Sequence, residues 1–305
     1  MKKVLSISLG SSKRDHRVET DILGEKFIIE RKGTDGDKKK AARLFAEYDG
    51  KYDAFGMGGI DLYIYSGKNR YAFRDARKLI KDVKKTPTVD GSGLKNSLER
   101  KVVRYLYNEM GLDFEGKNVL MVSAMDRFGM AETFNELGAN IVFGDLIFCL
   151  GVPVSIKSLK TLDILARVVA PVVTMLPFEL VYPTGDKQNS GVNKKKYWKY
   201  YNRADIIAGD FHYIKRYMPE RLDNKIIITN TVTRENIEEL KRKGVAMLVT
   251  TTPNLNGRSF GTNVMEGVLV ALSGKQPDEM TTSDYLELLD KIGFKPTVFN
   301  FKEDQ

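Results

Sequence analysis

Short apolar runs alternate with helix-like segments along most of the chain. In the first third, residues 4–9, 27–30 and 54–57 read as strands, and residues 37–48 place apolar side chains at the spacing of an amphipathic helix. Residues 62–73 alternate apolar and polar positions on either side of a glycine-containing turn, which predicts a β-hairpin. These elements predict a small mixed α/β domain.

Six further apolar runs follow Gly116, with helix-like segments between them. Because most of these runs are apolar at every position, we expect parallel strands of a sheet that is covered on both faces. With 305 residues, the chain is predicted to be an α/β protein of two domains. Residues 1–115 would form an N-terminal α/β substrate and catalytic domain, and residues 116–305 a Rossmann-like, nucleotide-binding domain with a doubly wound parallel sheet. The predicted strands of the second domain are 119–122, 141–143, 172–175, 205–208, 226–229 and 246–250.

The first βαβ unit of the second domain, residues 118–145, carries the clearest functional pattern. One strand ends in Ser123 and Ala124, and the next ends at Asp145, 22 positions after Ser123. In nucleotide-binding folds an acid at about this distance hydrogen-bonds a ribose hydroxyl. The residues that we assign to cofactor binding lie in the turn, at the acid and after a later strand: Ser123, Ala124, Met125, Arg127, Asp145 and Thr251.

Two segments together resemble the shikimate/quinate dehydrogenase family. Thr88-Val-Asp90-Gly-Ser-Gly-Leu94 is similar to the Asn-Thr-Asp-Gly-x-Gly loop of that family, and the βαβ unit follows it at a similar distance. Thr250-Thr-Thr-Pro253 and Asn263-Val-Met-Glu-Gly267 resemble the family's last strand and returning helix.

The resemblance implies a function close to that of quinate 5-dehydrogenase, with hydride transfer between NAD or NADP and a small hydroxylated acid. It implies that Asp90 is the catalytic aspartate. The family also has a lysine near the substrate, in a Ser-Val-Thr-x-Pro-His-Lys type of segment that does not occur here. Lys68 and Lys85 are the candidates for this role.

The glycine loop of such folds is replaced here by Ser123-Ala-Met-Asp-Arg-Phe-Gly129. Met125 would crowd the backbone contact with a pyrophosphate, and Asp126 would repel phosphates by about 1–4 kcal/mol at contact distance. Two alternatives therefore stay open. One is an S-adenosylmethionine-dependent transferase, whose cofactor has no pyrophosphate, although no terminal antiparallel hairpin is evident in the sequence. The other is a non-catalytic, dehydrogenase-like protein that binds a ligand.

Further polar side chains are candidates for proton transfer or for binding a small anionic molecule. His212 follows a predicted strand, and its unperturbed pKa of about 6.5 suits general acid–base catalysis. With two histidines in the chain and no carboxylates near them at metal spacing, we predict no metal site. The residues that we assign to substrate or anion binding lie in polar loops: Ser11, Ser12, Thr184, Lys187 and Arg258.

The net charge of +9 favours anionic partners, although acidic and basic residues are mixed along most of the chain. Residues 193–203 interleave lysines with aromatics, which we interpret as one amphipathic helix and not as a nucleic-acid site. No apolar run approaches the about 20 residues that span a bilayer, so no membrane contact is predicted. A single cysteine, Cys149, excludes an intramolecular disulfide and favours a cytoplasmic location. The sequence does not determine the oligomeric state, and a homodimer is one candidate.

Overall fold

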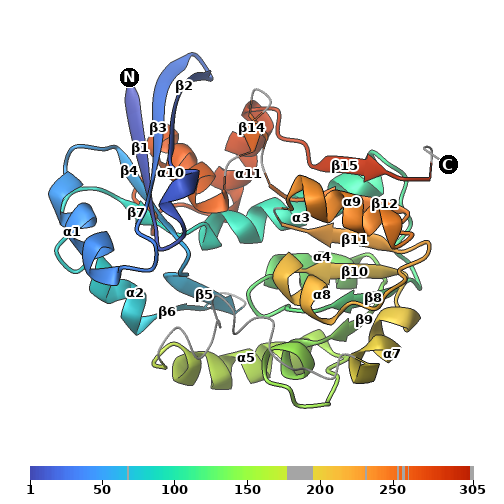
Figure 1. Cartoon of the computed structure of the whole chain (residues 1–305). Coiled ribbons are helices and arrows are strands. Elements are labelled where there is room, and N and C mark those ends of the chain that lie inside the picture. The colour runs from blue at the N-terminus through green and yellow to red at the C-terminus, as the bar shows by residue number, and fades with distance from the viewer. Residues whose placement is uncertain are drawn as a thin grey trace. The chain divides into compact units, whose positions relative to one another are not determined.

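The structure is a computed structural model that describes residues 1–66, 69–176, 195–230, 232–252, 254–255, 258–259 and 261–302. Its elements fall into two compact units. Unit 1 comprises Met1–Leu98, Ala170–Phe178 and Leu255–Phe294, and unit 2 comprises Glu99–Val169, Glu179–Asn254 and Lys295–Gln305. Each unit has a sheet of its own (Figure 1), so the predicted class, an α/β protein with two domains, is confirmed.

Unit 1 is built on a five-stranded sheet in the order β2-β3-β1-β4-β7. Four of its strands are parallel, and β2 pairs with β3 in the antiparallel sense at one edge. The central strand β1 is buried from Val4 to Ser8, where two serines lie in the core beside the apolar residues. The bounds are β1 Lys2–Ser8, β2 His16–Ile22, β3 Glu25–Gly33, β4 Ala54–Gly58 and β7 Thr88–Val89.

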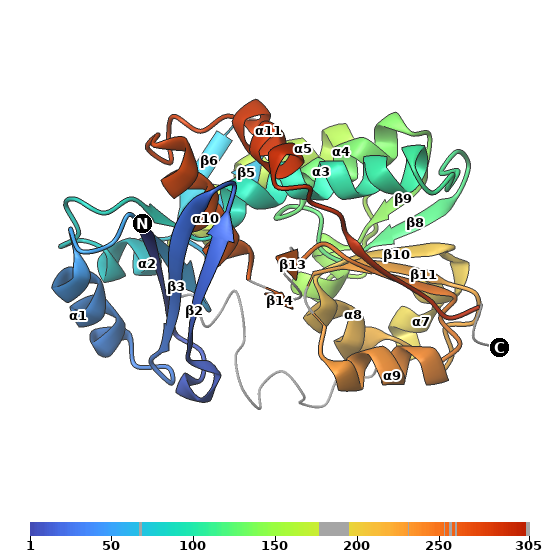
Figure 2. The same cartoon turned by 90° about the horizontal axis from the view of Figure 1, so that it is seen from above.

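Helices cover both faces of this sheet. Helix α1 (Lys38–Tyr48) lies on one side, next to α2 (Arg74–Leu79), and α10 (Thr262–Ser273) lies on the other side, next to α11 (Thr282–Lys291), as Figures 1 and 2 show. Helix α10 approaches the sheet closely at Gly267, where an added Cβ would lie 3.0 Å from Val4 Cγ1. The late segment 255–294 therefore belongs to the unit that begins the chain.

Two further elements of unit 1 surround the end of β7. The predicted hairpin is present as β5 (Tyr63–Ser66) and β6 (Asn69–Ala72), which form a separate two-stranded sheet. Helix α3 (Ser92–Asn108) begins three residues after β7, and the boundary between the units, after Leu98, falls within it. A third small sheet joins β13 (Asn254–Leu255) and β14 (Arg258–Ser259).

Unit 2 contains a six-stranded sheet in the order β15-β12-β11-β10-β8-β9. Five strands are parallel, and β15 pairs with β12 in the antiparallel sense at the edge. The chain passes from β8 to β9 on one side and then returns to β10 on the other side of β8. The bounds are β8 Asn118–Met121, β9 Asn140–Phe143, β10 Ile206–Gly209, β11 Ile226–Thr229, β12 Met247–Thr250 and β15 Thr297–Asn300.

The core of unit 2 includes an aromatic cluster that α7 (Lys195–Arg203) helps to form. Tyr197 and Tyr201 of this helix are buried and pack with Phe148 and Tyr217. The lysines of α7 remain exposed. This arrangement agrees with one amphipathic helix that has its aromatics inward. The remaining helices are α4 Phe128–Glu136, α5 Leu159–Val173, α8 Phe211–Tyr217 and α9 Arg234–Arg242, with a π-helical turn, η2, at Asp145–Cys149.

Three features differ from the sequence-based expectations. Residues 172–175 were expected to form a strand, but they form the end of α5 and the turn after it, so the sheet has only β9 beyond β8. The boundary between the units lies after Leu98 and not near Gly116, and residues 255–294 return to unit 1. The strands β2 and β15 were not expected, and β15 supplies an antiparallel strand at the end of the sheet.

None of the helices in the described part of the chain combines the length and the apolar character that a membrane span requires.

Candidate functional site

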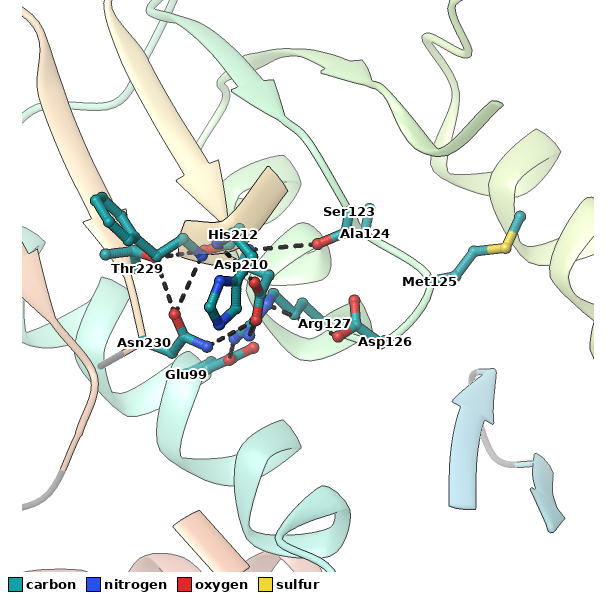
Figure 3. Close-up of polar contacts among 12 residues, drawn as sticks. Glu99, Ser123, Ala124, Met125, Asp126, Arg127, Asp210, His212, Thr229 and Asn230 are labelled. Atoms are coloured by element: carbon teal, nitrogen blue, oxygen red, sulfur yellow. Dashed lines mark hydrogen bonds and ion pairs between the residues drawn. The ribbon is translucent and has the colours of Figure 1, made fainter. Parts of the chain in front are cut away.

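The reversal of strand order in unit 2 fixes where a ligand is expected. In an open parallel sheet, ligands bind at the carboxyl ends of the two strands between which the order reverses, here β8 and β10. Ser123 follows β8 and Asp210 follows β10, and the backbone N–H of Asp210 donates to Ser123 Oγ at 3.3 Å. Figure 3 shows the residues gathered there, Glu99, Ser123, Asp126, Arg127, Asp210 and Asn230. Together with Asp145, which binds the turn after β8, we call them the switch-point site.

Asp145 holds the turn that follows β8. Its Oδ1 accepts the backbone N–H groups of Ala124 and Met125, at 2.8 and 2.9 Å. Burial raises the pKa of Asp145 to about 6, the two backbone donors oppose this shift, and the charge of Asp126 adds to it. Two N–H groups that a phosphate-binding turn would offer are therefore already satisfied by a carboxylate of the same chain.

The second oxygen of Asp145 has a different environment. Asp145 Oδ2 is buried and has no hydrogen-bond partner among the described residues. Because nearly all buried polar atoms in proteins are paired, this oxygen is a candidate acceptor for a hydrogen bond from a ligand.

Arg127 lies at the centre of a buried ion-pair network in Figure 3. Its guanidinium pairs with Glu99 and, at 3.3 Å, with Asp210, and its Nε lies 3.9 Å from Asp126 Oδ2. The side chains of Arg127 and Glu99 are 2% and 1% exposed. The guanidinium therefore pairs with carboxylates of the protein itself and is not available as a counter-ion for a cofactor phosphate.

Asn230 links the end of β11 to the same network. Its Nδ2 donates to Asp210 Oδ2 at 2.7 Å, and its Oδ1 accepts from the backbone N–H of Phe211 at 3.1 Å. Asp210 also accepts the N–H of His212 and so caps α8. The ends of β8, β10 and β11 are thus fixed together by side chains.

The switch-point site carries an excess of acidic groups. The carboxyl groups of Glu99, Asp126 and Asp210 lie within 4 Å of the guanidinium of Arg127, and a fourth carboxyl group, that of Asp145, binds the turn that follows β8. A phosphate charge placed about 4 Å from one of these carboxylates would cost about 1–4 kcal/mol. This part of the molecule is therefore acidic, although the chain as a whole has a net charge of +9.

The other residues predicted in unit 2 lie around this network. The side chain of Met125 points away from Asp210 and Asn230 in Figure 3. His212 is exposed on the first turn of α8. Thr251 is buried at the end of β12, where its N–H donates to Thr229 O at 2.8 Å. The structure places Ser123, Ala124, Arg127 and Asp145 together, and the roles of all these residues stay predictions.

In unit 1, Asp90 follows β7 and is enclosed by hydrogen-bond donors. Its Oδ2 accepts from the N–H groups of Leu62 and Tyr63, at 2.5 and 2.8 Å. Its Oδ1 accepts from the N–H and the hydroxyl of Ser92, at 3.0 and 2.5 Å. Asp90 therefore joins the start of the hairpin to the start of α3, and its catalytic role stays a prediction.

Glu266 of α10 forms a second buried carboxyl group near Asp90. Its Oε2 accepts from Gly91 N at 2.6 Å, and its Oε1 accepts from Tyr285 Oη at 2.8 Å. Burial, reinforced by the charge of Asp90, raises the pKa of Glu266 to about 8. The raised pKa favours the protonated form of Glu266 at neutral pH, beside the Asp-Gly-Ser-Gly loop.

Neither of the two lysines predicted to act with Asp90 is seen next to it in the described part of the chain. Lys85 is exposed and precedes β7, whereas Asp90 follows it, so the two lie at opposite ends of that strand. Lys68, Thr184 and Lys187 lie outside the described residues. Arg258 is in β14, but its side chain is outside what the structure describes.

The predicted anion loop after β1 is filled by groups of the protein. Ser12 N donates to Asp35 Oδ1 at 2.8 Å, and Ser11 Oγ accepts from Lys13 N at 3.2 Å. The backbone donor and the hydroxyl that were assigned to an anion are thus used to shape the loop itself.

Several polar residues of these clusters were not assigned a site role from the sequence, among them Glu99, Glu266 and Asn230. Glu99 and Glu266 each lie on the buried face of a helix, where a lone carboxylate among apolar neighbours is the signal that could have identified them. Asn230 follows a predicted strand and could be placed at the carboxyl edge, but its partner was not evident. Among the described residues, no group of three or more His, Cys, Asp or Glu side chains is arranged to hold a metal ion.

Comparison with protein families gives one assignment. A family model described as "Domain of unknown function (DUF8754)" matches residues 93–301, which is more than half of the chain. The chain belongs to this family. A second model, "Domain of unknown function (DUF8753)", matches residues 3–90, so the two matches meet near the start of α3. No curated protein matches the chain.

Solved structures with a similar fold include dehydrogenases and sugar-binding proteins. The hetero-hexameric glutamate dehydrogenase from Thermus thermophilus is 12% identical, with 96% of this chain and 74% of that chain covered and a TM-score of 0.44. The NAD-dependent malic enzyme from Thermotoga maritima is 11% identical, with coverage of 96% and 85% and a TM-score of 0.36. The arabinose-binding protein AraP from Geobacillus stearothermophilus is 9% identical, with coverage of 99% and 97% and a TM-score of 0.42. At these scores neither class of protein indicates what this chain binds.

Proposed function

We propose that unit 2 binds, at the switch-point site, a nucleoside-type ligand that carries positive charge and no phosphate. S-adenosylmethionine has these properties, and we infer that the protein is an S-adenosylmethionine-dependent transferase. The single observation that carries the proposal is the acidic character of the site. Three carboxyl groups lie around one guanidinium, and a fourth, that of Asp145, occupies the turn that would hold a pyrophosphate.

Charge selects the ligand class. Asp126 and Asp210 are the partly exposed acids of the site, with side chains 17% and 22% exposed. A sulfonium placed about 4 Å from either carboxylate would gain the electrostatic energy that a phosphate would lose there. The adenosyl sulfonium therefore matches the site where a dinucleotide does not.

The ribose provides a second match. The orphaned Oδ2 of Asp145 can accept a hydrogen bond from a ribose hydroxyl, which is the role that an acid after the second strand has in nucleotide-binding folds. The bound ligand would then supply an electrophilic methyl group to a nucleophilic acceptor substrate.

A nicotinamide-dependent oxidoreductase that resembles quinate/shikimate dehydrogenases is the second candidate, with NAD or NADP as cofactor and a small hydroxylated acid as substrate. The observation that favours it is the pair of buried carboxyl groups, Asp90 and Glu266, at the start of α3. A protonated Glu266 with a pKa of about 8 beside Asp90 has the properties of a proton-transfer site.

Calorimetric titration of matched variants tests the proposal. Asp210→Asn keeps the cap of α8 but removes one negative charge from the carboxyl end of β10, and S-adenosylmethionine should bind at least about ten-fold more weakly, or 1.4 kcal/mol. Asp205→Asn is the matched control, because Asp205 lies at the opposite, amino end of the same strand. We expect this control to bind like the wild-type protein.

Titration with NAD and NADP separates the two candidates. Binding of either one to the wild-type protein, unchanged or strengthened by Asp210→Asn, together with no binding of S-adenosylmethionine, would replace the transferase by the oxidoreductase. Equal weakening of S-adenosylmethionine binding by both aspartate variants would instead indicate a general charge effect and would contradict recognition at the switch point.

A further inference from the structure

Two arginines of unit 1 converge on one glycine at the carboxyl end of β1. A methyl group at Gly10 would lie 2.7 Å from Arg14 Nη2 and 3.2 Å from Arg31 Nη2, so these two nitrogens are within about 6 Å of each other. The same position is 3.3 Å from Ser8 Oγ. Two positive groups and a hydroxyl therefore border the small space that the missing side chain of Gly10 leaves.

Arg31 is held in place by the surrounding loop. Its Nη1 donates to Ser11 O at 2.9 Å and to Asp15 Oδ1 at 2.8 Å, and its side chain is 12% exposed. Partial burial lowers the pKa of Arg31, and the nearby charge of Arg14 lowers it further. Nη2 has no protein partner among the described residues, so this end of the guanidinium remains available to a ligand.

Arg14 is the uncompensated member of the pair. In the described part of the chain, its guanidinium makes no hydrogen bond and no ion pair. An exposed arginine normally turns away from a second cation, because the two charges repel. Its position beside Arg31 is the arrangement that a bound anion would stabilise.

We propose that Arg14 and Arg31 clamp an oxyanion, the carboxylate or phosphate group of a small molecule, over Gly10. Guanidinium groups bind such groups through paired N–H donors and keep their charge at any physiological pH. Ser8 Oγ accepts from Gly10 N at 3.1 Å, so its own hydrogen is free to complete the site. Glycine at position 10 keeps open the volume that the oxyanion occupies.

This site lies beyond the proposed function and does not rest on it. It belongs to unit 1, and it has the opposite charge to the switch-point site. Ser11 and Ser12 shape the loop, whereas the binding groups are the two arginines next to it.

Titration of the full chain with inorganic phosphate and with malonate tests the clamp. Arg14→Gln removes only a group without protein partners, and it should weaken oxyanion binding at least about ten-fold. Lys13→Gln removes the same charge one residue away and should change binding less than about two-fold. Gly10→Ala fills the proposed volume and should abolish binding while the protein remains folded, which circular dichroism would confirm.

The two anions distinguish the source of the oxyanion. Tighter binding of phosphate indicates a phosphorylated ligand, and tighter binding of malonate indicates a carboxylic acid. Equal losses in Lys13→Gln and Arg14→Gln, binding that survives Gly10→Ala, or no binding of either anion would each overturn the clamp.

Thermal unfolding in buffer without such anions gives an independent readout. Because Arg14→Gln relieves the repulsion between the two guanidinium groups, its Tm should rise above that of the wild-type protein. A lower Tm would show that Arg14 supports the fold and would contradict a ligand-binding role.

Discussion

Replacing Glu266 by glutamine should remove one defined part of the pH dependence of stability. Glu266 is buried in unit 1, and its pKa is raised from 4.5 to about 8 by burial and by the charge of Asp90. Glutamine keeps the shape of the protonated side chain. Its oxygen can accept from Gly91 N as Glu266 does. Its amide would replace the oxygen that accepts from Tyr285 Oη, so the hydroxyl would become the acceptor of that hydrogen bond.

The sign and size of the effect follow from the two pKa values. A group whose pKa is raised on folding contributes stability that is fully present below its unfolded pKa, and that stability is lost as the pH rises through the folded pKa. For Glu266 the loss should run from about pH 4.5 to about pH 8. At about 1.4 kcal/mol per pH unit, it totals on the order of 5 kcal/mol.

Urea unfolding of the wild-type protein and of Glu266→Gln, at intervals from pH 5.5 to pH 9, measures this effect. The difference between the two proteins cancels the titrating groups that do not interact with Glu266. The variant should gain on the wild-type protein by about 1.4 kcal/mol per pH unit up to about pH 8, and the difference should then level off. A difference that stays constant from pH 5.5 to pH 8 would show that Glu266 ionises normally in the folded protein.

Three further perturbations follow from the buried groups. Arg127→Met leaves Glu99 and Asp210 without their buried cation and should lower the free energy of unfolding by about 3–5 kcal/mol in urea, and adding Glu99→Gln should recover part of the loss. Binding of S-adenosylmethionine should weaken as the pH falls through about 6, because Asp145 then becomes protonated, and calorimetry of Asp145→Asn should show weak binding with no such pH dependence. Gly91→Ala should cost about 1–3 kcal/mol, because Gly91 has φ +96° and an added Cβ would lie 2.8 Å from Asn263 N.

Each of these three perturbations has its own check. Little destabilisation by Arg127→Met would show that the network contributes no net stability. A steep loss of ligand binding below pH 6 that persists in Asp145→Asn would assign the titration to another group. For Gly91→Ala the control is Gly111→Ala, at φ +66° with no neighbour within 4 Å, and an equal loss in both would reduce the effect to backbone strain alone.

The sequence allowed the α/β class to be predicted because most core strands of unit 2 are short and apolar at every position. The same property misled the prediction at residues 172–175. An apolar, β-branched run of this length fits a helix as well as a strand, and here it ends α5. The edge strands β2 and β15 contain few apolar residues, so the sequence gives little signal for either strand.

The position of the candidate site could be predicted from the sequence, but the hydrogen bonds and ion pairs within it could not. Strand ends identify Ser123, Asp145 and Asp210, since the carboxyl ends of parallel strands share one edge. That Asp145 would turn back to the N–H groups of the β8–α4 turn, and that Arg127 would be buried between Glu99 and Asp210, depends on contacts between distant segments. Such contacts cannot be inferred from the local sequence, so Asp145 and Arg127 were interpreted as cofactor ligands.

The affinities of S-adenosylmethionine and S-adenosylhomocysteine for the wild-type protein at pH 7.5 test recognition at the switch-point site most directly. The two ligands share the adenosyl group and differ at the sulfonium, which only the former carries. We predict that S-adenosylmethionine binds at least about ten-fold more tightly, by calorimetry, and that NAD does not bind. Equal affinity for the two adenosyl ligands, or binding of NAD in place of both, would contradict an acidic site built for a cationic ligand.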